Sequence, residues 1–285
     1  MPDTQAPPPV TTAIRCRLIE DADLVAVAEL LARGFPERTV AYWRNGLERL
    51  RALPAGHHPR YGYLLEDNGR IGGVLLTLYA PGLDAPRCNL SSWYVEPDYR
   101  HLAMHLDRAA TRNRATTYVN ISPADHTRKL IKALGYVPLN EDTVIVLPWL
   151  SAIRGIKAEA YGPEHDAVLT AHETRLARDH VAWGCIALVA SGKLFVFQHK
   201  RLPGLPHGAV HVLYASSHDD LVHLAGPLGR ALLSHGIFVW KIDGAAVPRG
   251  LVGKHFTGRS ARWAKGPNPP ALNNLSYTEL AVFGP

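Results

Sequence analysis

Strand-like and helix-like patterns alternate in a fixed order over the first half of the chain. Residues 13–19 have strand composition, and Leu24, Val27, Leu30 and Leu31 then recur at helical spacing. The same reasoning predicts a helix over 40–54, two strands joined by a turn at 67–69, a strand over 88–95, a helix over 99–112, a strand over 116–122, a helix over 125–136 and a strand over 142–150. The predicted order is therefore strand, two helices, three strands, helix, strand, helix, strand.

The second half repeats this order of elements without a visible repeat of residues. A strand, a helix, a hairpin, a strand, a helix interrupted by Pro227 and two further strands are predicted over 155–162, 163–180, 185–200, 207–216, 219–236, 237–244 and 275–284. A recurring element order indicates two copies of one architecture. We therefore predict an α/β protein with mixed (α+β) sheets. Its two tandem domains are expected at 13–150 and 155–285, after a disordered tail at 1–12.

The composition is that of an ordinary globular protein with a sizeable core. Hydrophobic residues make up 47% of the 285 residues and charged residues 20%, which excludes wholesale disorder. The formal net charge of +6 favours an anionic partner, because a positive field concentrates anions. A phosphorylated cofactor, a nucleic acid and an anionic surface all fit that charge.

The location of the protein is predicted from its cysteines and its apolar runs. Cys16, Cys88 and Cys185 are odd in number and far apart, which argues against a disulfide framework or a cysteine zinc site and favours a reducing cytoplasm. The first twelve residues lack the pattern of a secretory signal. The longest apolar run, 181–190, is too short to cross a bilayer, so no membrane insertion is expected.

The stretch VEPDYRHLAMHL, residues 95–106, is typical of a strand that ends in a turn before a helix. The first turn of a helix has unpaired backbone N–H groups and the positive end of the helix dipole. Phosphate groups are the usual ligands of such a site. The stretch is therefore a candidate phosphate-binding loop, although alanine and histidine stand where such loops favour glycine.

At these residues the sequence resembles the GCN5-related N-acetyltransferase (GNAT) superfamily, whose Q/R-x-x-G-x-G/A loop holds the pyrophosphate of acyl-coenzyme A. Arg100 matches the first position of that loop, Ala103 replaces its first glycine, and His105 stands at its last small position. Residues 120–136 look like the family's next strand and helix, which typically ends in L-G-F or L-G-Y. The resemblance covers residues 13–150 and rests on element order alone beyond Gly155.

The resemblance implies acyl-coenzyme A, acetyl or longer, as co-substrate, with no metal. It places the thioester against the end of a strand, the pyrophosphate on the loop and the pantetheine amides on the next strand. The implied cofactor-binding residues are Tyr94, Val95, Arg100, His101, Leu102, Ala103, Met104, His105, Asn120 and Ser122.

The resemblance also suggests catalytic residues. The family often has a tyrosine four residues before the L-G-F glycine, which protonates the departing thiolate, but this position is Ile131. His126 and Tyr136 are the nearby candidate donors, and Glu96 is the candidate base. Proton transfer by such groups contributes roughly 10²–10⁴-fold to a rate.

Other polar clusters fit structural roles better than ligand sites. His101 and His105 have the spacing of a metal pair, but no glutamate completes an H-E-x-x-H site. Asp219 and Asp220, beside two histidines, stand where a helix favours carboxylates at its start. The basic stretch 250–267 is interpreted as a solvated loop, with an anion contact as the alternative.

We predict a tandem acyltransferase that transfers an acyl group from acyl-coenzyme A to an amine or hydroxyl by direct attack. The acceptor is expected to be a small molecule, such as a saccharide or an amino acid, bound with help from a degenerate second domain. A catalytically silent binding module and an aminoacyl-tRNA-dependent transferase of the same fold are the alternatives. Nucleic acid is not the favoured partner, and a homodimer stays open.

Overall fold

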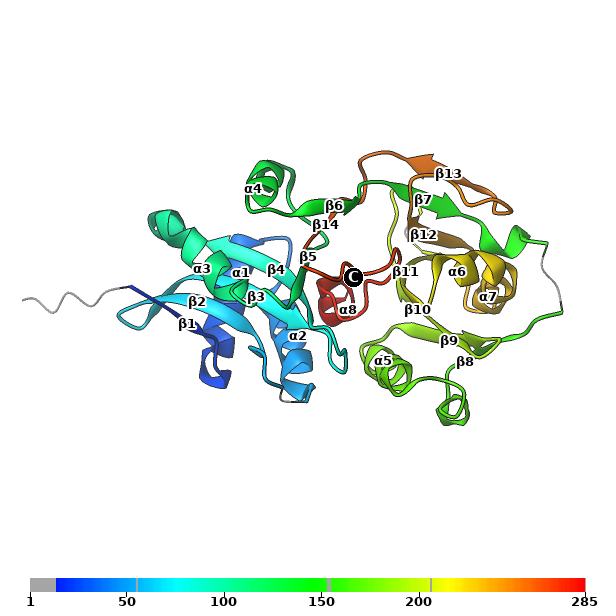
Figure 1. The fold of residues 1–285 in the computed structure, drawn as a ribbon, viewed down its shortest axis with the longest axis horizontal. Coiled ribbons are helices and arrows are strands. Elements are labelled where there is room, and N and C mark those ends of the chain that lie inside the picture. The colour runs from blue at the N-terminus through cyan, green and yellow to red at the C-terminus, as the bar shows by residue number, and fades with distance from the viewer. Residues whose placement is uncertain (1–13, 55, 153–154, 206, 285) are drawn as a thin grey trace, which may run out of the picture.

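The computed structural model describes residues 14–54, 56–152, 155–205 and 207–284, and the predicted tail at 1–12 lies outside them. These residues form two seven-stranded sheets with helices around them (Figure 1). The first sheet contains β1 (Arg15–Leu18), β2 (Gly62–Asp67), β3 (Arg70–Tyr79), β4 (Arg87–Val95), β5 (Thr117–Asn120), β6 (Val137–Asn140) and β14 (Arg262–Lys265). The second contains β7 (Thr143–Val146), β8 (Ala158–Ala160), β9 (Ile186–Ala190), β10 (Lys193–His199), β11 (Ala209–Ala215), β12 (Val239–Asp243) and β13 (Gly253–Phe256).

The helices lie at the positions that apolar spacing predicts in the first half and are shorter in the second. They are α1 (Leu24–Gly34), α2 (Val40–Ala52), α3 (Ala103–Ala110), α4 (Arg128–Ala133), α5 (Ala171–Ala182), α6 (His218–His223), α7 (Ala225–Leu233) and α8 (Glu279–Phe283). The helix predicted over 219–236 is divided into α6 and α7, with Pro227 inside the first turn of α7, where a missing N–H costs little. Among the described residues, no helix has the length and apolar content to cross a membrane.

The two sheets have the same strand order, and each half of the chain contributes one strand to the sheet of the other half. The first sheet runs β1-β2-β3-β4-β5-β14-β6, and the second, from its other edge, runs β8-β9-β10-β11-β12-β7-β13. In each sheet a single pair is parallel, β4 with β5 and β11 with β12. The repeated architecture is therefore confirmed, and β14 and β7 each complete the sheet of the opposite half.

Two predictions about strands were wrong. The strand predicted over 142–150 was expected to finish the first unit, but β7 pairs with β12 and β13 in the second sheet. An apolar sequence indicates that a segment forms a buried strand, but it does not indicate which sheet the strand joins. The final strand predicted over 275–284 is instead an extended stretch followed by α8, because a short apolar run fits a buried helix as well as a strand.

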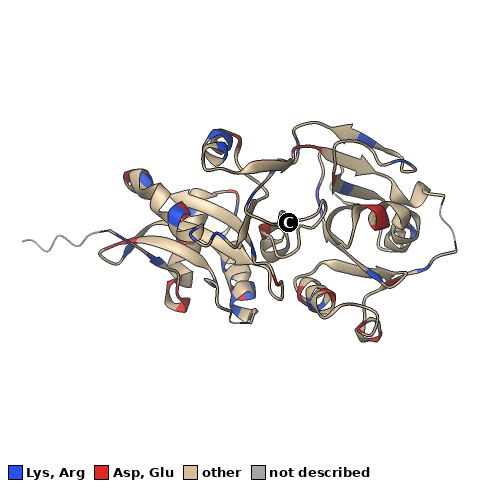
Figure 2. Cartoon of the chain, viewed as in Figure 1, with Lys and Arg blue, Asp and Glu red and all other residues tan. Residues whose placement is uncertain are grey.

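A shared apolar core joins the two halves. Helices α1 and α2 cover one face of the first sheet and α3 the other. The core between the sheets combines Val119 of β5 and Ala264 of β14 with Val196 of β10 and Leu213 of β11. Lys and Arg positions are spread over both halves (Figure 2). The halves thus form one packed body, and the net positive charge is not confined to one of them.

Helix α8 is held against α2 by a close contact that depends on a glycine. A Cβ atom on Gly46 would lie 1.9 Å from Cδ1 of Phe283, so no larger residue fits there. Gly46→Val is therefore expected to lower the free energy of unfolding by about 1–3 kcal/mol and to displace α8. Chemical denaturation measures the first effect, and the emission of Trp43, whose ring lies 5.2 Å from that of Phe283, reports the second.

Gly56→Ala is the matched control, since a Cβ atom there would meet nothing closer than 4.0 Å. Equal stability and equal emission of both variants would show that α8 is not seated on Gly46.

Candidate functional site

Strands β4 and β5 form a fork in the first sheet. They pair in parallel over three residue pairs, from Arg87 with Thr117 to Asn89 with Val119. Strand β5 then ends at Asn120, whereas β4 continues to Val95. The edge of β4 that faces β5 therefore loses its partner strand beyond Asn89, and its backbone groups become available to a ligand.

A bulge bends β4 within the open part of the fork. Ser91 pairs with Leu76 and Tyr94 with Val74, so Ser92 and Trp93 together oppose a single residue of β3. Ser92 has φ 53°, in the left-handed region that L-residues rarely adopt. Bulges of this kind redirect a strand and its side chains next to functional sites.

Polar side chains gather where the two strands diverge. Asn89 donates from Nδ2 to Val119 O (3.2 Å) and accepts at Oδ1 from the backbone N–H of Glu279 (2.8 Å). The hydroxyl of Ser122 donates to the Glu279 carboxylate, and the Ser91 hydroxyl is a second hydrogen-bonding neighbour of that group. A carboxylate from the second half of the chain thus lies at the mouth of the fork in the first.

Burial changes the acidity of this carboxylate. Desolvation raises the pKa of Glu279 above its ordinary value, even though the hydrogen bonds from Ser122 and Ser91 and the positive charge of Arg262 act in the opposite direction. The residue as a whole is only partly buried. A carboxylate with a raised pKa is a stronger base than an exposed one and is suited to accepting a proton.

The bridging segment, which we define as residues 271–284, delivers Glu279 to the fork. It first enters the equivalent fork of the second sheet, where the Asn273 side chain accepts from Asp243 N–H (2.9 Å) and Leu275 N–H donates to Leu213 O (2.7 Å). It then passes Arg87, which donates to the Ser276 hydroxyl (2.8 Å). The segment fills the second fork with protein, consistent with the expectation that the second half is degenerate.

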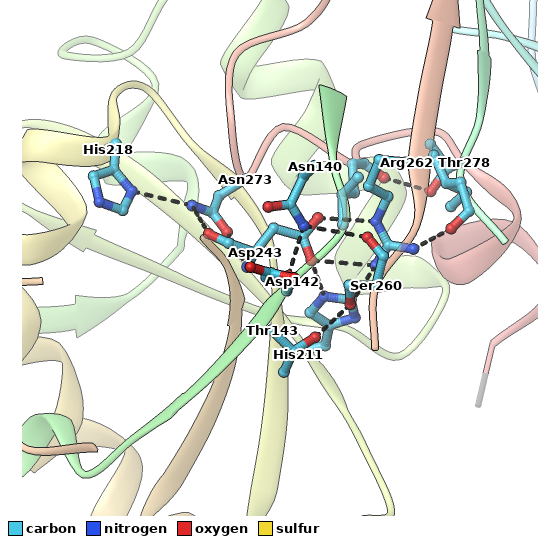
Figure 3. A network of polar contacts seen from close by, with 12 residues as sticks. Asn140, Asp142, Thr143, His211, His218, Asp243, Ser260, Arg262, Asn273 and Thr278 are labelled. Carbon is cyan, nitrogen blue, oxygen red and sulfur yellow. Dashed lines mark hydrogen bonds and ion pairs between the residues drawn. The ribbon is translucent and has the colours of Figure 1, made fainter. Parts of the chain in front are cut away.

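A buried ion pair lies beside the bridging segment (Figure 3). Arg262 Nε donates to Asp243 Oδ2 at 2.9 Å, and another guanidinium nitrogen donates to Ile121 O. Arg262 is in β14 of the first sheet, whereas Asp243 is in β12 of the second. The interpretation of 250–267 as a solvated loop is therefore wrong, because this stretch supplies β13 and β14 and buries Arg262.

The predicted phosphate loop adopts a tight helical turn. Residues 97–102 form a 3₁₀-helix that leads into α3, and the N–H of Ala103 already bonds to Arg100 O. The side chains of Arg100, His101 and His105 are exposed, whereas Leu102, Ala103 and Met104 are partly buried. His105 is therefore an exposed residue in the first turn of α3.

The predicted base, Glu96, is held between two arginines. Arg33 approaches one carboxylate oxygen at 3.1 Å and Arg70 the other at 2.7 Å. Burial alone would raise the pKa of Glu96, but the hydrogen bonds and charges of the two arginines outweigh it and lower that pKa. The ion pairs make Glu96 a weaker proton acceptor than a free carboxylate.

The two predicted proton donors lie elsewhere. Tyr136 is buried in the core on the α3 side with Leu106 and Ile131, and burial strongly raises its pKa. Its hydroxyl has no hydrogen-bond partner among the residues that the structure describes. The side chain of His126 lies outside the described residues. Their roles stay predictions.

The remaining predicted cofactor residues surround the fork. The Tyr94 ring packs 6.2 Å from that of Phe35, on the face covered by α1 and α2. Val95 is buried, and Asn120 pairs with Trp263 of β14. Within the part of the chain that the structure describes, Ser122 is the one member of the predicted set that hydrogen-bonds to the Glu279 carboxylate.

The histidine and aspartate clusters have structural surroundings. Asp219 and Asp220 lie in the first turn of α6, which Ser217 caps by accepting from Asp220 N–H (3.0 Å). His218 contacts the Asn273 amide at 3.2 Å. Within the described ranges, no group of three or more His, Cys, Asp or Glu residues is placed to hold a metal ion.

Sequence reasoning missed Glu279, Asn89 and Ser91. No local motif marks them, and Glu279 was assigned to a strand. Asn89 and Glu279 are 190 residues apart in the sequence, so only the fold brings them together.

Comparisons with known proteins agree with this geometry at the level of the fold. No family model matches the sequence, and no curated protein matches it significantly. Among solved structures, a GCN5-related N-acetyltransferase from Anabaena variabilis has a TM-score of 0.58 at 9% identity, covering 88% of this chain and 72% of that one. One from Kribbella flavida has a TM-score of 0.54 at 13% identity, covering 88% and 70%.

A tandem GNAT protein from the clavulanic acid biosynthesis pathway matches over its whole length. Its TM-score is 0.51 at 15% identity, and the match covers 90% of this chain and 100% of that one. The chain therefore has the GNAT fold in two tandem copies, as the sequence predicted.

Proposed function

We propose that this protein is an acyltransferase that moves an acyl group from acyl-coenzyme A directly to an amine or hydroxyl of a small acceptor. The observation that carries the proposal is the Glu279 carboxylate at the mouth of the fork, beside the open edge of β4. The fold is shared with proteins named as N-acetyltransferases. Bound acyl-coenzyme A would supply an activated thioester.

Strand β4 offers a backbone donor along its open edge. The N–H of Glu96 bonds to Gly72 O of β3 at 2.9 Å. Successive amides of a strand point to opposite sides, so the N–H of Val95 points toward the fork. A donor there can stabilise the negative charge that develops on a thioester oxygen under attack.

The segment from Arg100 to His105 is proposed for the diphosphate. The exposed imidazole of His105 leaves the start of α3 accessible, and the helix dipole favours an anion there. Because the N–H of Ala103 is already bonded within the turn, the Arg100 guanidinium is the main proposed contact.

Glu279 is proposed as the general base, approaching from the acceptor side. Helix α8 packs with α2 on one face of the first sheet, whereas α3 lies on the opposite face. The carboxylate takes the proton of the attacking amine or hydroxyl as the bond to the acyl carbon forms. The C–S bond breaks, and the sulfur leaves as a thiolate. His126 and Tyr136 stay proposals for the group that protonates it.

Calorimetric titration of the full chain with acetyl-coenzyme A and longer thioesters tests this function. Arg100→Gln is expected to weaken binding roughly ten-fold or more, the size of a lost charge-assisted contact. Arg108→Gln, which removes an exposed arginine at the other end of α3, is the matched control and should bind normally.

Absence of binding with every thioester would contradict the proposal. In that case, binding of aminoacyl-tRNA would support the tRNA-dependent alternative, and absence of both would support the silent binding module.

A further inference from the structure

Two lysines lie on the face of the second sheet that looks toward the first. Strand register places Lys241 beside His211, and Lys200 N–H bonds to Ala209 O, so both side chains share the face of His211. On that face Gln198 donates to Leu280 O of the bridging segment. Lys200 and Lys241 therefore face the space beside α8.

Neither lysine has a partner for its charge among the described residues. Both are partly buried, and within the described ranges no ion pair or hydrogen bond involves either ammonium group. The carboxylate closest to Lys241 along its own strand, Asp243, is already bonded to Arg262. Partly buried cations without a counter-ion are costly, so a bound anion would stabilise both lysines.

Burial and neighbouring positive charges lower the pKa of both lysines. Burial and then the charge of Arg262 lower the pKa of Lys241 to about 8, with Lys200 adding to this effect and Asp243 acting in the opposite direction. Burial and then the charges of Arg38 and Arg262 lower the pKa of Lys200. Arg38 precedes α2 in the first half, so both halves contribute positive charge to the same region.

A cavity adjoins Lys200. It has a volume of about 480 Å³ and lies where β10 ends and β11 begins. Among the described residues, its ionisable lining consists of basic residues and histidines: His199, Lys200, Arg201, His207 and His235. No carboxylate stands in that described lining, so the cavity extends the region that favours an anion.

We propose that the acceptor of the acyl group carries an anionic group, a carboxylate or a phosphate, that binds to Lys200 and Lys241. This inference rests on the proposed acyltransferase function and names its substrate class. The geometry assigns the charge recognition to the second half, the base Glu279 to the bridging segment, and the thioester to the first half.

The test compares pairs of matched acceptors, each in the presence of saturating acetyl-coenzyme A. The release of the coenzyme A thiol measures the rate. Alanine is compared with alanine amide, and glucosamine 6-phosphate with glucosamine. The expected result is a preference of about ten-fold or more in kcat/KM for the anionic member of one pair, which also distinguishes carboxylate from phosphate. Equal use of both members in each pair that is turned over would overturn the proposal.

The double variant Lys200→Gln with Lys241→Gln is expected to abolish that preference. It should leave the affinity for acetyl-coenzyme A, which is proposed to bind to the first half, unchanged. Lys193→Gln is the matched control, because Lys193 begins β10, the strand that Lys200 follows, but contacts Asp220 of α6 at 3.1 Å. A preference that persists in the double variant would refute the assignment.

A binding measurement separates this inference from the proposed function. If no acceptor pair is turned over, inorganic phosphate and acetate are titrated into the full chain and the double variant. If the double variant binds either ion at least ten-fold more weakly than the wild type, the anion site is supported whether or not acyl transfer occurs. Equal affinity for both proteins, or no binding to either, refutes it.

Discussion

Glu279→Gln is expected to lower kcat by about 10²–10⁴-fold, the contribution of a positioned general base. Glutamine has the size of glutamate and can still accept the hydrogen bond from Ser122, but it cannot take up a proton. The KM for acyl-coenzyme A should change little, because the side chain acts on the acceptor. Steady-state kinetics with a saturating thioester measures both constants.

The pH profile makes this test specific. Burial raises the pKa of Glu279, so the ascending limb of kcat should lie above the ordinary glutamate value of about 4.3 and should disappear in the variant. Glu96→Gln is the natural comparison, since arginine contacts lower the pKa of Glu96. A large loss in Glu96→Gln with none in Glu279→Gln would assign the base to Glu96 instead.

Arg262→Met is expected to lower the free energy of unfolding by about 3–5 kcal/mol. The change removes the guanidinium partner of Asp243 and leaves the buried carboxylate with the more distant His211, at 3.8 Å, beside it. It also removes the hydrogen bond from Arg262 to Ile121 O. The variant therefore loses a contact within the first sheet as well as the one to the second. Urea denaturation at neutral pH measures the difference.

The dependence on pH identifies the charge as the cause. Burial would raise the pKa of Asp243, but Arg262 and His211 outweigh it and hold that pKa well below its usual range. Stability from such a group is present above the unfolded pKa, near 3.9, and is lost as the pH falls toward the folded pKa. The difference in the free energy of unfolding between the wild type and Arg262→Met should therefore become smaller at acidic pH.

Adding Asp243→Asn to Arg262→Met is the control, because replacing both partners removes the uncompensated charge. The double variant is expected to recover much of the loss. A double variant as unstable as the single one would show that lost packing, not charge, causes the effect.

The sequence predicted the elements of the fold well because their periods are local. The turn at 67–69 is the hairpin between β2 and β3, with Asn68 and Gly69 at φ 51° and 83°. The helix predicted over 125–136 is the shorter α4, which ends at Ala133 and is followed by Gly135 with φ 86°. These features depend on a few neighbouring residues, so a single sequence contains the information for them.

Strand partners and the site were less accessible from the sequence. Nothing in β7 indicates that it crosses to the second sheet, since its apolar side chains suit either core. Glu279 has no motif around it and becomes a candidate base only through contacts with Asn89 and Ser122. Long-range pairing creates this site, so inspection of the phosphate loop alone could not locate its base.

The exchanged strands also set the order in which the protein can fold during synthesis. Strand β14 inserts between β5 and β6, although β5 and β6 precede it by more than a hundred residues. Until residues 262–265 emerge from the ribosome, the edges of β5 and β6 that pair with β14 have no partner strand. Contacts of such sequence separation form slowly, and exposed edges invite aggregation. A nascent chain of this protein therefore spends most of its translation with an incomplete first sheet, and chaperones have a long interval in which to bind it.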